Sequence, residues 1–342
     1  MGKIVVTGGT GYIGSHTVVE LQNAGFEVLI IDNLSNSNVE VLNGIEAITG
    51  KRPQFENLDC LDYVGLDRLF SKNEGIEAII HFAASKAVGE SVEKPLLYYR
   101  NNLVSLMNLL ELMPLHGIKN IVFSSSCTVY GQPDKLPVSE TAPIKPALSP
   151  YGNTKQICEE IIRDTLHANT GLRSILLRYF NPIGAHPSAL IGELPNGVPN
   201  NLIPFVTQTA IGVRKQLSVF GDDYNTPDGS CIRDYINVVD LAKAHVVAMK
   251  RMIEQKSKSR LELFNLGTGR GLSVLEILKI FKEVNQVEVP YKIVNRRDGD
   301  IEQVWANPDK ANNILGWKAQ ETVEDTLKSA WDWEKHLAEK RK

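Results

Sequence analysis

The sequence has few cysteines, no long apolar run and little net charge, and each shortage excludes a class of protein. Its four cysteines form no CxxC pair, and no histidine lies at zinc-ligand spacing from any of them. We therefore expect reduced thiols and no metal site. No apolar run approaches the roughly 18 residues of a membrane span, and Met1–Val6 does not resemble a signal peptide. A net charge of −3 gives no electrostatic reason to expect nucleic acid or a membrane as partner. We therefore expect a cytoplasmic enzyme or binding protein.

What the first half does contain is an alternation of short β-branched runs with longer amphipathic stretches. Several of the short runs are continuously apolar, which is typical of parallel strands covered by helices on both faces. The pattern predicts strands at Lys3–Val6, Glu27–Ile31, Gln54–Asn57, Ala78–Phe82, Asn120–Ser124 and Ser174–Tyr179. It predicts helices near Tyr12–Asn23, Tyr63–Lys72, Pro95–Leu112 and Pro150–Asn169. The predicted fold class is therefore α/β, with an N-terminal doubly wound parallel sheet of the Rossmann type.

The second half of the sequence differs from the first in its composition and patterning. Residues 182–232 are rich in Pro, Gly and Asn, which is typical of binding loops. Helical patterning returns at Val238–Gln255 and Ser273–Val284, with a strand at Leu261–Leu266 between them. We predict one domain at 1–183 and a smaller C-terminal α/β domain at 184–342, with 236–268 as a candidate to pack back onto the first sheet. The charged tail, Glu334–Lys342, is expected to fray.

The segment Thr7–Gly14 lies between the first predicted strand and the first predicted helix. Gly8, Gly11 and Gly14 allow a tight turn, close approach of the backbone to a pyrophosphate, and tight packing of the helix on the strand. The start of the helix then offers free N–H groups to the phosphates. A glycine triplet alone could be a plain turn, and Asp32 alone could be a turn residue. Because Asp32 ends the second strand, where it can accept bonds from ribose hydroxyls, the two features together predict a dinucleotide site.

Asp32 also bears on which dinucleotide is bound. The residues that follow it contain no Arg or Lys, so a 2′-phosphate would meet a carboxylate and no cation, and we predict NAD rather than NADP. Asp59 and Cys60, after the third strand, are expected to flank the adenine. The run Phe82–Lys86, after the fourth strand, is expected to pass beneath the cofactor, although Lys86 could equally be a solvated loop residue.

Tyr151 and Lys155 lie four residues apart at the start of a predicted helix, and hence on one face. They follow the strand that ends in Ser124–Ser126, and parallel-sheet enzymes carry their chemistry at the carboxyl ends of strands. A neighbouring ammonium, together with an oxidised nicotinamide, would lower the pKa of a tyrosine and make it a base. Ser126 could then hold the reacting hydroxyl. A strand-end turn and a half-buried helix aromatic are the alternatives, and Cys127, with no histidine nearby in sequence, is interpreted as a small buried residue.

Read in order, these motifs make the chain similar to the extended short-chain dehydrogenase/reductase superfamily, and within it to the UDP-glucose 4-epimerase family. The similarity runs over nearly the whole chain. It is carried by the segments Thr7–Gly14, Lys86–Ser91, Ser124–Gly131, Ser149–Gly152, Arg178–Pro182, Pro199–Leu202 and Ile232–Ile236. A series of matches in this order is far more specific than any one of them.

The resemblance implies a role for each matching residue. Ser126 and Tyr151 would be catalytic, and Lys155 would tune Tyr151 and hold the nicotinamide ribose. NAD, tightly bound and not consumed, would contact Gly8, Gly11, Tyr12, Ile13, Gly14, Asp32, Asn33, Leu34, Ser35, Asn36, Ser37, Asp59, Cys60, Phe82, Ala83, Ala84, Ser85, Lys86, Asn101, Ser126, Tyr151, Lys155 and Phe180. The nucleotide sugar would contact Lys86, Ser126, Tyr151, Asn181, Asn201, Leu202, Ser218, Val219, Phe220, Arg233, Arg297, Asp300 and Val304. Arginines suit a diphosphate, although the Arg296–Arg297 pair could also be solvated surface charge.

The implied reaction is an isomerisation in galactose metabolism, between UDP-galactose and UDP-glucose, through a transient 4-keto sugar and enzyme-bound NADH. A nucleotide-sugar 4,6-dehydratase would need an acid beside the catalytic serine, where this chain has Cys127 and Thr128. A non-catalytic NAD-sensing module would be expected to lack Tyr151 or Lys155. The small Val304 leaves room for N-acetylated UDP-sugars as well. The family is commonly homodimeric, and pairing would here use helices near Pro95–Leu112 and Gly152–Asn169.

Overall fold

The computed structural model describes residues 2–168, 171–297 and 300–341. Its largest element is a seven-stranded sheet in which every neighbouring pair of strands is parallel. The strands lie in the order β10 (Leu261–Leu266), β6 (Arg173–Tyr179), β5 (Asn120–Ser126), β4 (Ile76–His81), β1 (Lys3–Thr7), β2 (Glu27–Asp32) and β3 (Gln54–Asn57). This confirms the predicted fold class. Each strand lies within two residues of its predicted limits.

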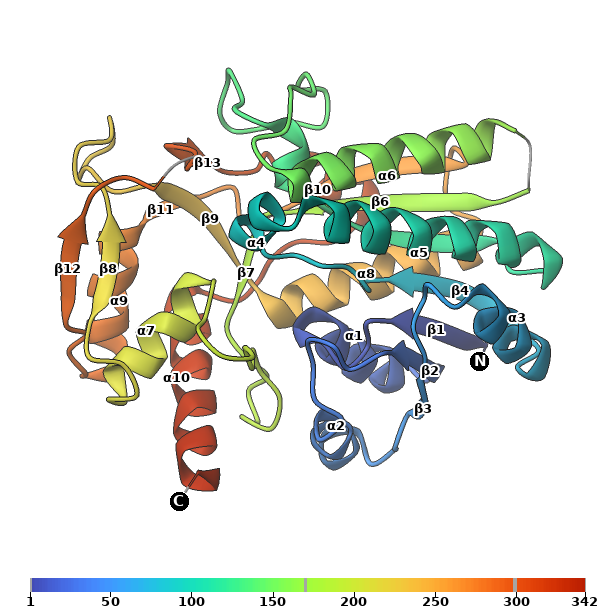
Figure 1. The fold of residues 1–342 in the computed structure, drawn as a ribbon, viewed down its shortest axis with the longest axis horizontal. Coiled ribbons are helices and arrows are strands. Elements are labelled where there is room, and N and C mark those ends of the chain that lie inside the picture. The colour runs from blue at the N-terminus through green and yellow to red at the C-terminus, as the bar shows by residue number, and fades with distance from the viewer. Residues whose placement is uncertain (1, 169–170, 298–299, 342) are drawn as a thin grey trace.

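Two layers of helices cover this sheet (Figure 1). One face carries α3 (Tyr63–Lys72), α5 (Pro95–Leu115) and α6 (Pro150–His167), and the other carries α1 (Tyr12–Asn23) and α8 (Val238–Ile253). The sequence of β1 is continuously apolar because each face of the strand packs against a different hydrophobic core. Ile4 and Val6 pack in the core on one face of the sheet, and Val5 packs in the core on the other face. The residues Met1, Asn169 and Lys342, which the sequence predictions include, lie outside the described residues.

A smaller lobe is formed by segments from the second half of the chain. It contains α7 (Leu202–Ala210), α9 (Val274–Asn285), α10 (Val323–Lys340), and two short sheets formed by β7 (Asn181–Ile183), β9 (Ile232–Asn237), β11 (Gly271–Ser273) and β13 (Gln303–Val304), and by β8 (Leu217–Phe220) with β12 (Tyr291–Val294). The expectation that 182–232 is loop was therefore wrong in part, since β7, α7, β8 and the start of β9 fall within it. These elements share a core of their own that includes Val206, Leu217 and Phe281.

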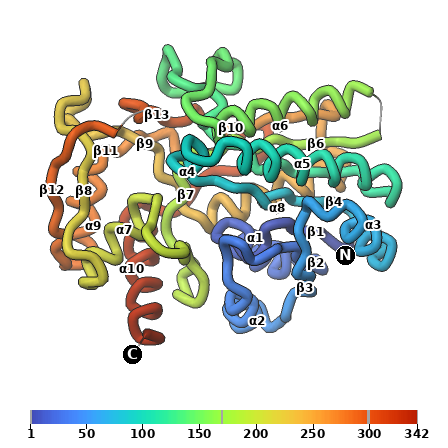
Figure 2. The backbone as a smooth tube through the Cα atoms, in the orientation of Figure 1, coloured from blue at the N-terminus to red at the C-terminus, as the bar shows by residue number. Residues whose placement is uncertain are grey.

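The chain returns to the large lobe between these elements. Helix α8 packs beside α1, and β10 pairs with β6 in register from Leu261 to Leu266 (Figure 2). Segments that are far apart in sequence thus share one core, and the segment 236–268 contributes to the first sheet. The domain limits 1–183 and 184–342 stay a prediction.

Four α-helices of the described residues were not predicted: α2 (Val41–Thr49), α4 (Val88–Glu93), α7 and α10. The expectation of a frayed tail was wrong for Glu334–Lys340, which is helical. Glu334 explains this, because its buried carboxylate accepts hydrogen bonds from Thr207 at 3.1 Å and Arg341 at 3.0 Å. These contacts join a charged segment to the core of the smaller lobe.

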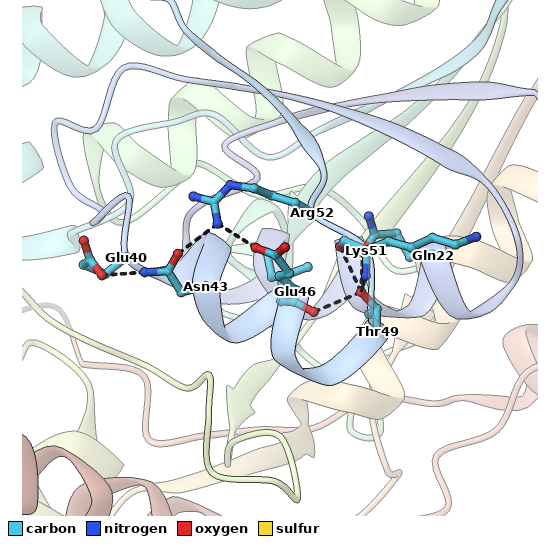
Figure 3. Close-up of polar contacts among 8 residues, drawn as sticks. Gln22, Glu40, Asn43, Glu46, Thr49, Lys51 and Arg52 are labelled. Carbon is cyan, nitrogen blue, oxygen red and sulfur yellow. Dashed lines mark hydrogen bonds and ion pairs between the residues drawn. The ribbon is translucent and has the colours of Figure 1, made fainter.

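Helix α2 follows the loop after β2 and packs beside α1, and polar contacts hold it in place (Figure 3). Arg52 donates to Asn43 at 2.9 Å and to Glu46 at 2.8 Å. Thr49 donates to Gln22 of α1 at 2.9 Å, which ties the two helices together. The loop after Asp32 is therefore held between two anchored elements.

The remaining structural findings concern membranes, metals and cysteines. No helix among the described residues combines the length and the apolar character that crossing a membrane requires. Within the same residues, no group of three or more His, Cys, Asp or Glu side chains is arranged to hold a metal ion. All four cysteines are free thiols.

Candidate active site

The glycine turn between β1 and α1 forms a cradle that a side chain would fill. A Cβ on Gly14 would lie 2.2 Å from the carbonyl oxygen of Gly8, and one on Gly8 would lie 2.8 Å from the nitrogen of Ala83. Gly8 also has a φ of +70°, which disfavours any residue with a side chain. Gly11 is the N-cap of α1, and no side chain within the described residues caps that end. The free N–H groups and the helix dipole make this turn suited to an anion.

Asp32 lies at the carboxyl end of β2, beside this turn. Its Oδ2 accepts a hydrogen bond from the backbone N–H of Thr10 at 3.2 Å. Its Oδ1 accepts from the N–H of Leu34 at 2.9 Å and from the hydroxyl of Ser37 at 3.0 Å. These bonds hold the carboxylate in one orientation and order the loop around it, so that it can accept further bonds from vicinal hydroxyls.

The residues predicted to flank the adenine lie at the end of β3. Asn33 donates to Asp59 at 2.9 Å, which joins the ends of β2 and β3. Cys60 is buried, and its carbonyl accepts from Asn108 at 2.9 Å. Burial raises the pKa of the Cys60 thiol to about 12, so this residue is a neutral wall and not a nucleophile.

The run Phe82–Lys86 leaves β4 toward α5. The N–H of Ser85 donates to Asn102 at 2.8 Å, and Asn101 donates to the hydroxyl of Ser85 at 3.2 Å. The Lys86 side chain is 46% exposed, and its Nζ lies 3.7 Å from Oε1 of Glu193. Lys86 is therefore half solvated and pairs with an acidic residue, and its place beneath the cofactor stays a prediction.

Helix α6 begins with a signature that fixes the position of Tyr151. The hydroxyl of Ser149 accepts from the N–H of Gly152 at 3.1 Å, and Pro150 occupies the first helical position. Tyr151 therefore lies in the first turn, with Lys155 one turn later on the same face. Lys155 is 3% exposed, and its Nζ lies 6.0 Å from the centre of the Tyr151 ring.

Ser126 is the last residue of β5 and the N-cap of a short 3₁₀ turn, Cys127–Tyr130. Its hydroxyl oxygen accepts from the N–H of Thr128 at 3.2 Å and from the Thr128 hydroxyl at 3.0 Å. A hydrogen bond between Ser126 and Tyr151 lowers the pKa of Tyr151. The fold thus brings the three predicted catalytic residues together at the carboxyl end of β5.

Burial dominates the electrostatics of this group. It raises the pKa of Tyr151 well above its ordinary value, and the neighbouring Tyr179 raises it further. Burial also lowers the pKa of Lys155 to about 8. The sequence argument expected a lowered pKa for Tyr151. That expectation included an oxidised nicotinamide beside Tyr151 and stays a prediction; for the chain by itself, desolvation of the phenolate is the largest effect and the pKa is raised.

The predicted diphosphate contacts centre on one carboxylate. Asp300 Oδ1 accepts from Arg297 at 2.6 Å and lies 3.9 Å from Nη2 of Arg233 on β9. Arg297 also lies over the ring of Phe220, 5.5 Å from its centre. Its side chain is 58% exposed, as a solvated surface charge would be, and its contact with a diphosphate stays a prediction. Arg296 instead donates to Asp223 at 2.6 Å.

The other predicted substrate contacts lie on elements of the smaller lobe. Asn181 starts β7, next to the buried Phe180. Asn201 is the N-cap of α7, just before Leu202, and donates to Glu193 at 2.6 Å. Strand β8 carries Ser218, buried Val219 and exposed Phe220. Val304 is 3% exposed and packs in one cluster with Phe180, Val129, Tyr130, Val138 and Ala306, against the partly buried Cys127.

Sequence reasoning missed several polar residues at this site. Thr128 contacts Ser126, and Glu193 contacts both Lys86 and Asn201. Tyr179 shares a short hydrogen bond with Ser124. No spacing rule indicates Glu193, which lies in a Gly- and Pro-rich stretch. Glu159 could have been found from the sequence, because it lies eight residues after Tyr151 and hence on the same face of the same helix.

Comparison with known proteins adds an independent finding. A family model described as GDP-mannose 4,6 dehydratase matches residues 5–330. The UDP-glucose 4-epimerase of Bacillus subtilis is 52% identical to this chain, over 97% of the chain and 96% of its own length. The UDP-glucose 4-epimerase of Mus musculus is 50% identical, over 98% of the chain and 97% of its own length.

Solved structures agree with the sequence comparison. The UDP-glucose 4-epimerase of Stenotrophomonas maltophila, with bound NAD and formylated UDP-arabinopyranose, superimposes with a TM-score of 0.96 at 45% identity, covering 99% of this chain and 100% of that one. The enzyme of Bifidobacterium longum, in complex with NAD+ and UDP, has a TM-score of 0.94 at 46% identity, covering 98% and 99%. This chain therefore belongs to the UDP-glucose 4-epimerase family, within the extended short-chain dehydrogenases/reductases.

Proposed function

We propose that this protein is an NAD-dependent UDP-glucose 4-epimerase, an isomerase that interconverts UDP-galactose and UDP-glucose through a transient 4-keto sugar. The observation that carries the proposal is the meeting of Ser126, Tyr151 and Lys155 at the carboxyl end of β5. Relatives with 45–46% identity have been crystallised with NAD and either UDP or a UDP-sugar. Membership of the family and the composition of the site thus support the same reaction.

The residues of the glycine turn fit NAD. Gly8, Gly11 and Gly14 leave space where a Cβ would collide with backbone, and the uncapped start of α1 suits a pyrophosphate. Asp32 would accept the adenosine ribose hydroxyls, and no cation follows it that could hold a 2′-phosphate. When bound, NAD supplies a reversible acceptor for the hydrogen at C4 of the sugar. Because the reaction has no net redox change, we propose that NAD stays tightly bound and is not consumed.

Each catalytic side chain has a distinct task. Tyr151 takes the proton of the sugar 4-hydroxyl and later returns it, while Ser126 holds that hydroxyl in line. The raised pKa of Tyr151 means that its phenolate needs a cationic partner, and the position of Lys155 Nζ, 6.0 Å from the centre of the ring, supports that role. Lys155 also holds the nicotinamide ribose. The Tyr151 phenol therefore both accepts the proton and returns it.

Inversion at C4 requires that the sugar present both faces to the same base. The diphosphate must then stay anchored while the sugar turns about its link to it. Arg233 and Arg297 suit this anchor because guanidinium groups bind phosphate oxygens in pairs. The uridine and sugar would be held by Asn181, Asn201, Leu202, Ser218, Val219, Phe220, Asp300 and Val304. An anchored diphosphate and a loose sugar pocket are therefore the two requirements of the site.

A 4,6-dehydratase is the nearest alternative, and the family model bears that description. Dehydration needs an acid beside the catalytic serine. The residues at that point are Cys127, whose pKa burial raises to about 12, and Thr128, whose hydroxyl donates to Ser126. Neither suits an acid at neutral pH, so epimerisation is favoured.

Two finer properties complete the proposal. We propose a homodimer that pairs α5 and α6, since Leu96, Leu97 and Met107 of α5 are 79%, 49% and 38% exposed. We also propose that the enzyme works in the cytoplasm in galactose metabolism, which suits four free thiols. Sedimentation of the wild type and of a Leu96→Glu variant tests the dimer. We expect a dimer that this charge weakens.

The proposed reaction is tested by supplying UDP-galactose to the purified holoprotein without added NAD. We expect UDP-glucose to accumulate to an equilibrium mixture with no net change in absorbance at 340 nm. A dehydrogenase would instead stop after one turnover and would resume when NAD is added. An absence of UDP-glucose under both conditions would reject the proposal.

A further inference from the structure

A buried ion pair lies at the base of the catalytic group. The Arg178 guanidinium of β6 makes two hydrogen bonds with the Glu159 carboxylate of α6, one of them 2.8 Å from Nε to Oε1. The two side chains are 3% and 4% exposed. The guanidinium also lies over the ring of Tyr130, 4.7 Å from its centre. Replacing a buried pair of this kind with apolar residues is often neutral for stability, so its presence calls for another explanation.

The pair connects directly to the strand that carries the catalytic serine. The hydroxyl of Ser125 donates to Oε1 of Glu159 at 2.5 Å, and Ser125 lies between Ser124 and Ser126 on β5. Ser124 in turn accepts the Lys155 ammonium through its carbonyl at 2.7 Å. Glu159 and Lys155 therefore hold α6 to adjacent residues of one strand.

Without Glu159, Lys155 and Arg178 would be two buried cations with no carboxylate to balance them. Lys155 and Glu159 are four residues apart on α6, and hence neighbours on one face of the helix. Arg178 brings a second buried cation to the same helix through its contact with Glu159. Two buried cations without a carboxylate between them would disfavour each other, and the lysine is the one that can lose its proton.

We propose that Glu159 is a positioning residue for the catalytic pair: its carboxylate balances Arg178 and holds α6 on β5, so that Lys155 stays an ammonium beneath Tyr151. This inference rests on the proposed function, in which that ammonium stabilises the phenolate. The role is electrostatic as well as structural, and this distinguishes it from an ordinary core contact.

Other groups face Lys155 and Tyr151 from the elements around them. On β4, burial and the charge of Lys155 lower the pKa of His81 to about 3, so His81 is neutral. On α6, burial raises the pKa of Cys158 to about 12. Tyr179 of β6 and Tyr98 of α5 also face Tyr151, and burial keeps both phenols neutral at pH 7. Glu159 differs from these neutral groups because its carboxylate is paired with Arg178. Burial is the largest effect on the pKa of Lys155 and lowers it, whereas Cys158 and Glu159 raise it.

The test compares the pH dependence of three holoproteins on UDP-galactose. In Glu159→Gln the amide can still accept from Ser125, but the negative charge is gone. We expect the basic limb of kcat/KM to move down by about one pH unit, because Lys155 loses its proton more easily. In the double variant Glu159→Gln/Arg178→Met both charges are gone, and we expect the limb to return most of the way to its wild-type position.

A matched control separates this role from stability. Arg251 and Glu262 form an ion pair of the same kind between α8 and β10, with bonds of 2.7 and 3.0 Å and exposures of 11% and 9%. We expect Glu262→Gln to lower the melting temperature without moving the pH limb. If Glu159→Gln and Glu262→Gln leave the limb in the same place, the proposal is wrong.

A direct titration keeps the inference separate from the proposed reaction. With ¹³C-labelled lysine, the Lys155 signal is identified by its loss in Lys155→Met, and its pKa is read by NMR in each variant. A lower pKa in Glu159→Gln supports the inference even if the wild type fails to epimerise UDP-galactose, which would reject the proposed function alone. An unchanged pKa overturns the inference even if the wild type is an active epimerase.

Discussion

Lys155 donates a hydrogen bond of 2.7 Å to the carbonyl oxygen of Ser124. That carbonyl lies two residues before Ser126, so the bond joins the helix of the proposed base to the strand of the proposed serine. This bond to backbone fixes the Lys155 ammonium against one point of β5. The ammonium therefore has a fixed place relative to the Tyr151 ring, and this relationship underlies the first two predictions.

Removal of either partner should abolish most of the activity. We expect Tyr151→Phe to lower kcat by about 10³-fold or more, because the variant has no group to accept the 4-hydroxyl proton. We expect Lys155→Met to lower kcat by about 10²-fold, because an uncharged neighbour leaves the phenolate unstabilised. Conversion of UDP-galactose is measured, with Tyr63→Phe on the surface of α3 as the control. Undiminished turnover in Tyr151→Phe would rule out the mechanism.

The wild-type pH profile should reflect Lys155. Its pKa is lowered to about 8, so the ammonium is present below that pH and is lost as the pH rises through it. We therefore expect kcat/KM to fall above about pH 8, with a slope that corresponds to one proton. The basic limb should be absent from the residual activity of Lys155→Met. A limb that persists in that variant would assign it to another group.

The glycine cradle predicts a sharp contrast between two substitutions. In Gly14→Ala the new methyl group would lie 2.2 Å from the Gly8 carbonyl oxygen, so the turn must open and lose NAD. In Gly89→Ala nothing lies within 4 Å of the new methyl group, and alanine favours the helix by about 1 kcal/mol. We expect Gly14→Ala to purify without cofactor and Gly89→Ala to retain it, as measured by the absorbance of NAD released on denaturation. Equal retention would show that the cradle tolerates a side chain.

Much of this architecture could be predicted from sequence because its signals are local. The apolar run of β1 predicts a strand buried on both faces, and Ser149 with Pro150 marks the start of α6. Helix α10 could not be predicted in the same way. Its stability comes from contacts such as Glu334 with Thr207, which are 127 residues apart in sequence.

The same limit applies to the site. The Tyr151 and Lys155 pair follows from helical spacing, but the direction of the Tyr151 pKa shift depends on burial, which spacing does not reveal. Glu193 contacts Lys86 only because the loop around residue 193 folds against the segment that follows β4. Side chains that meet through long-range folding carry no short motif, whereas those set by a turn or a helix do.

Three buried histidines should make the fold sensitive to acid. Burial lowers the pKa of His16 and His81 to about 3 and that of His245 to about 4. In the unfolded chain each of these histidines has a pKa near 6.5. Between the folded and the unfolded pKa values the unfolded chain therefore binds more protons than the folded protein does. The free energy of unfolding consequently decreases as the pH falls below about 6.5. Together the three account for about 4 kcal/mol per pH unit in that range.

This acid sensitivity is measured as the free energy of urea unfolding at pH 7.5, 6.0 and 5.0. The Thr7 hydroxyl shares a bond of 2.7 Å with His81, and His81→Gln can keep this bond without titrating. We expect that variant to flatten the slope by about one third. A slope unaffected by His81→Gln would mean that other groups take up the protons.

Val304 should decide which sugars enter the pocket. The residue is buried beside Phe180 and Cys127, and we propose that a larger side chain there would take space from the bound sugar. We expect the wild type to turn over UDP-N-acetylhexosamines as well as UDP-glucose and UDP-galactose. In Val304→Tyr we expect kcat/KM for the acetylated sugars to fall about 10²-fold further than for UDP-galactose, which is the scale of a steric exclusion. Val304→Ala is the control and should keep activity on both the acetylated and the non-acetylated sugars. A melting curve of Val304→Tyr shows whether the larger residue disturbs the core. Equal loss of both substrate classes in a folded Val304→Tyr protein would mean that this position does not select the sugar.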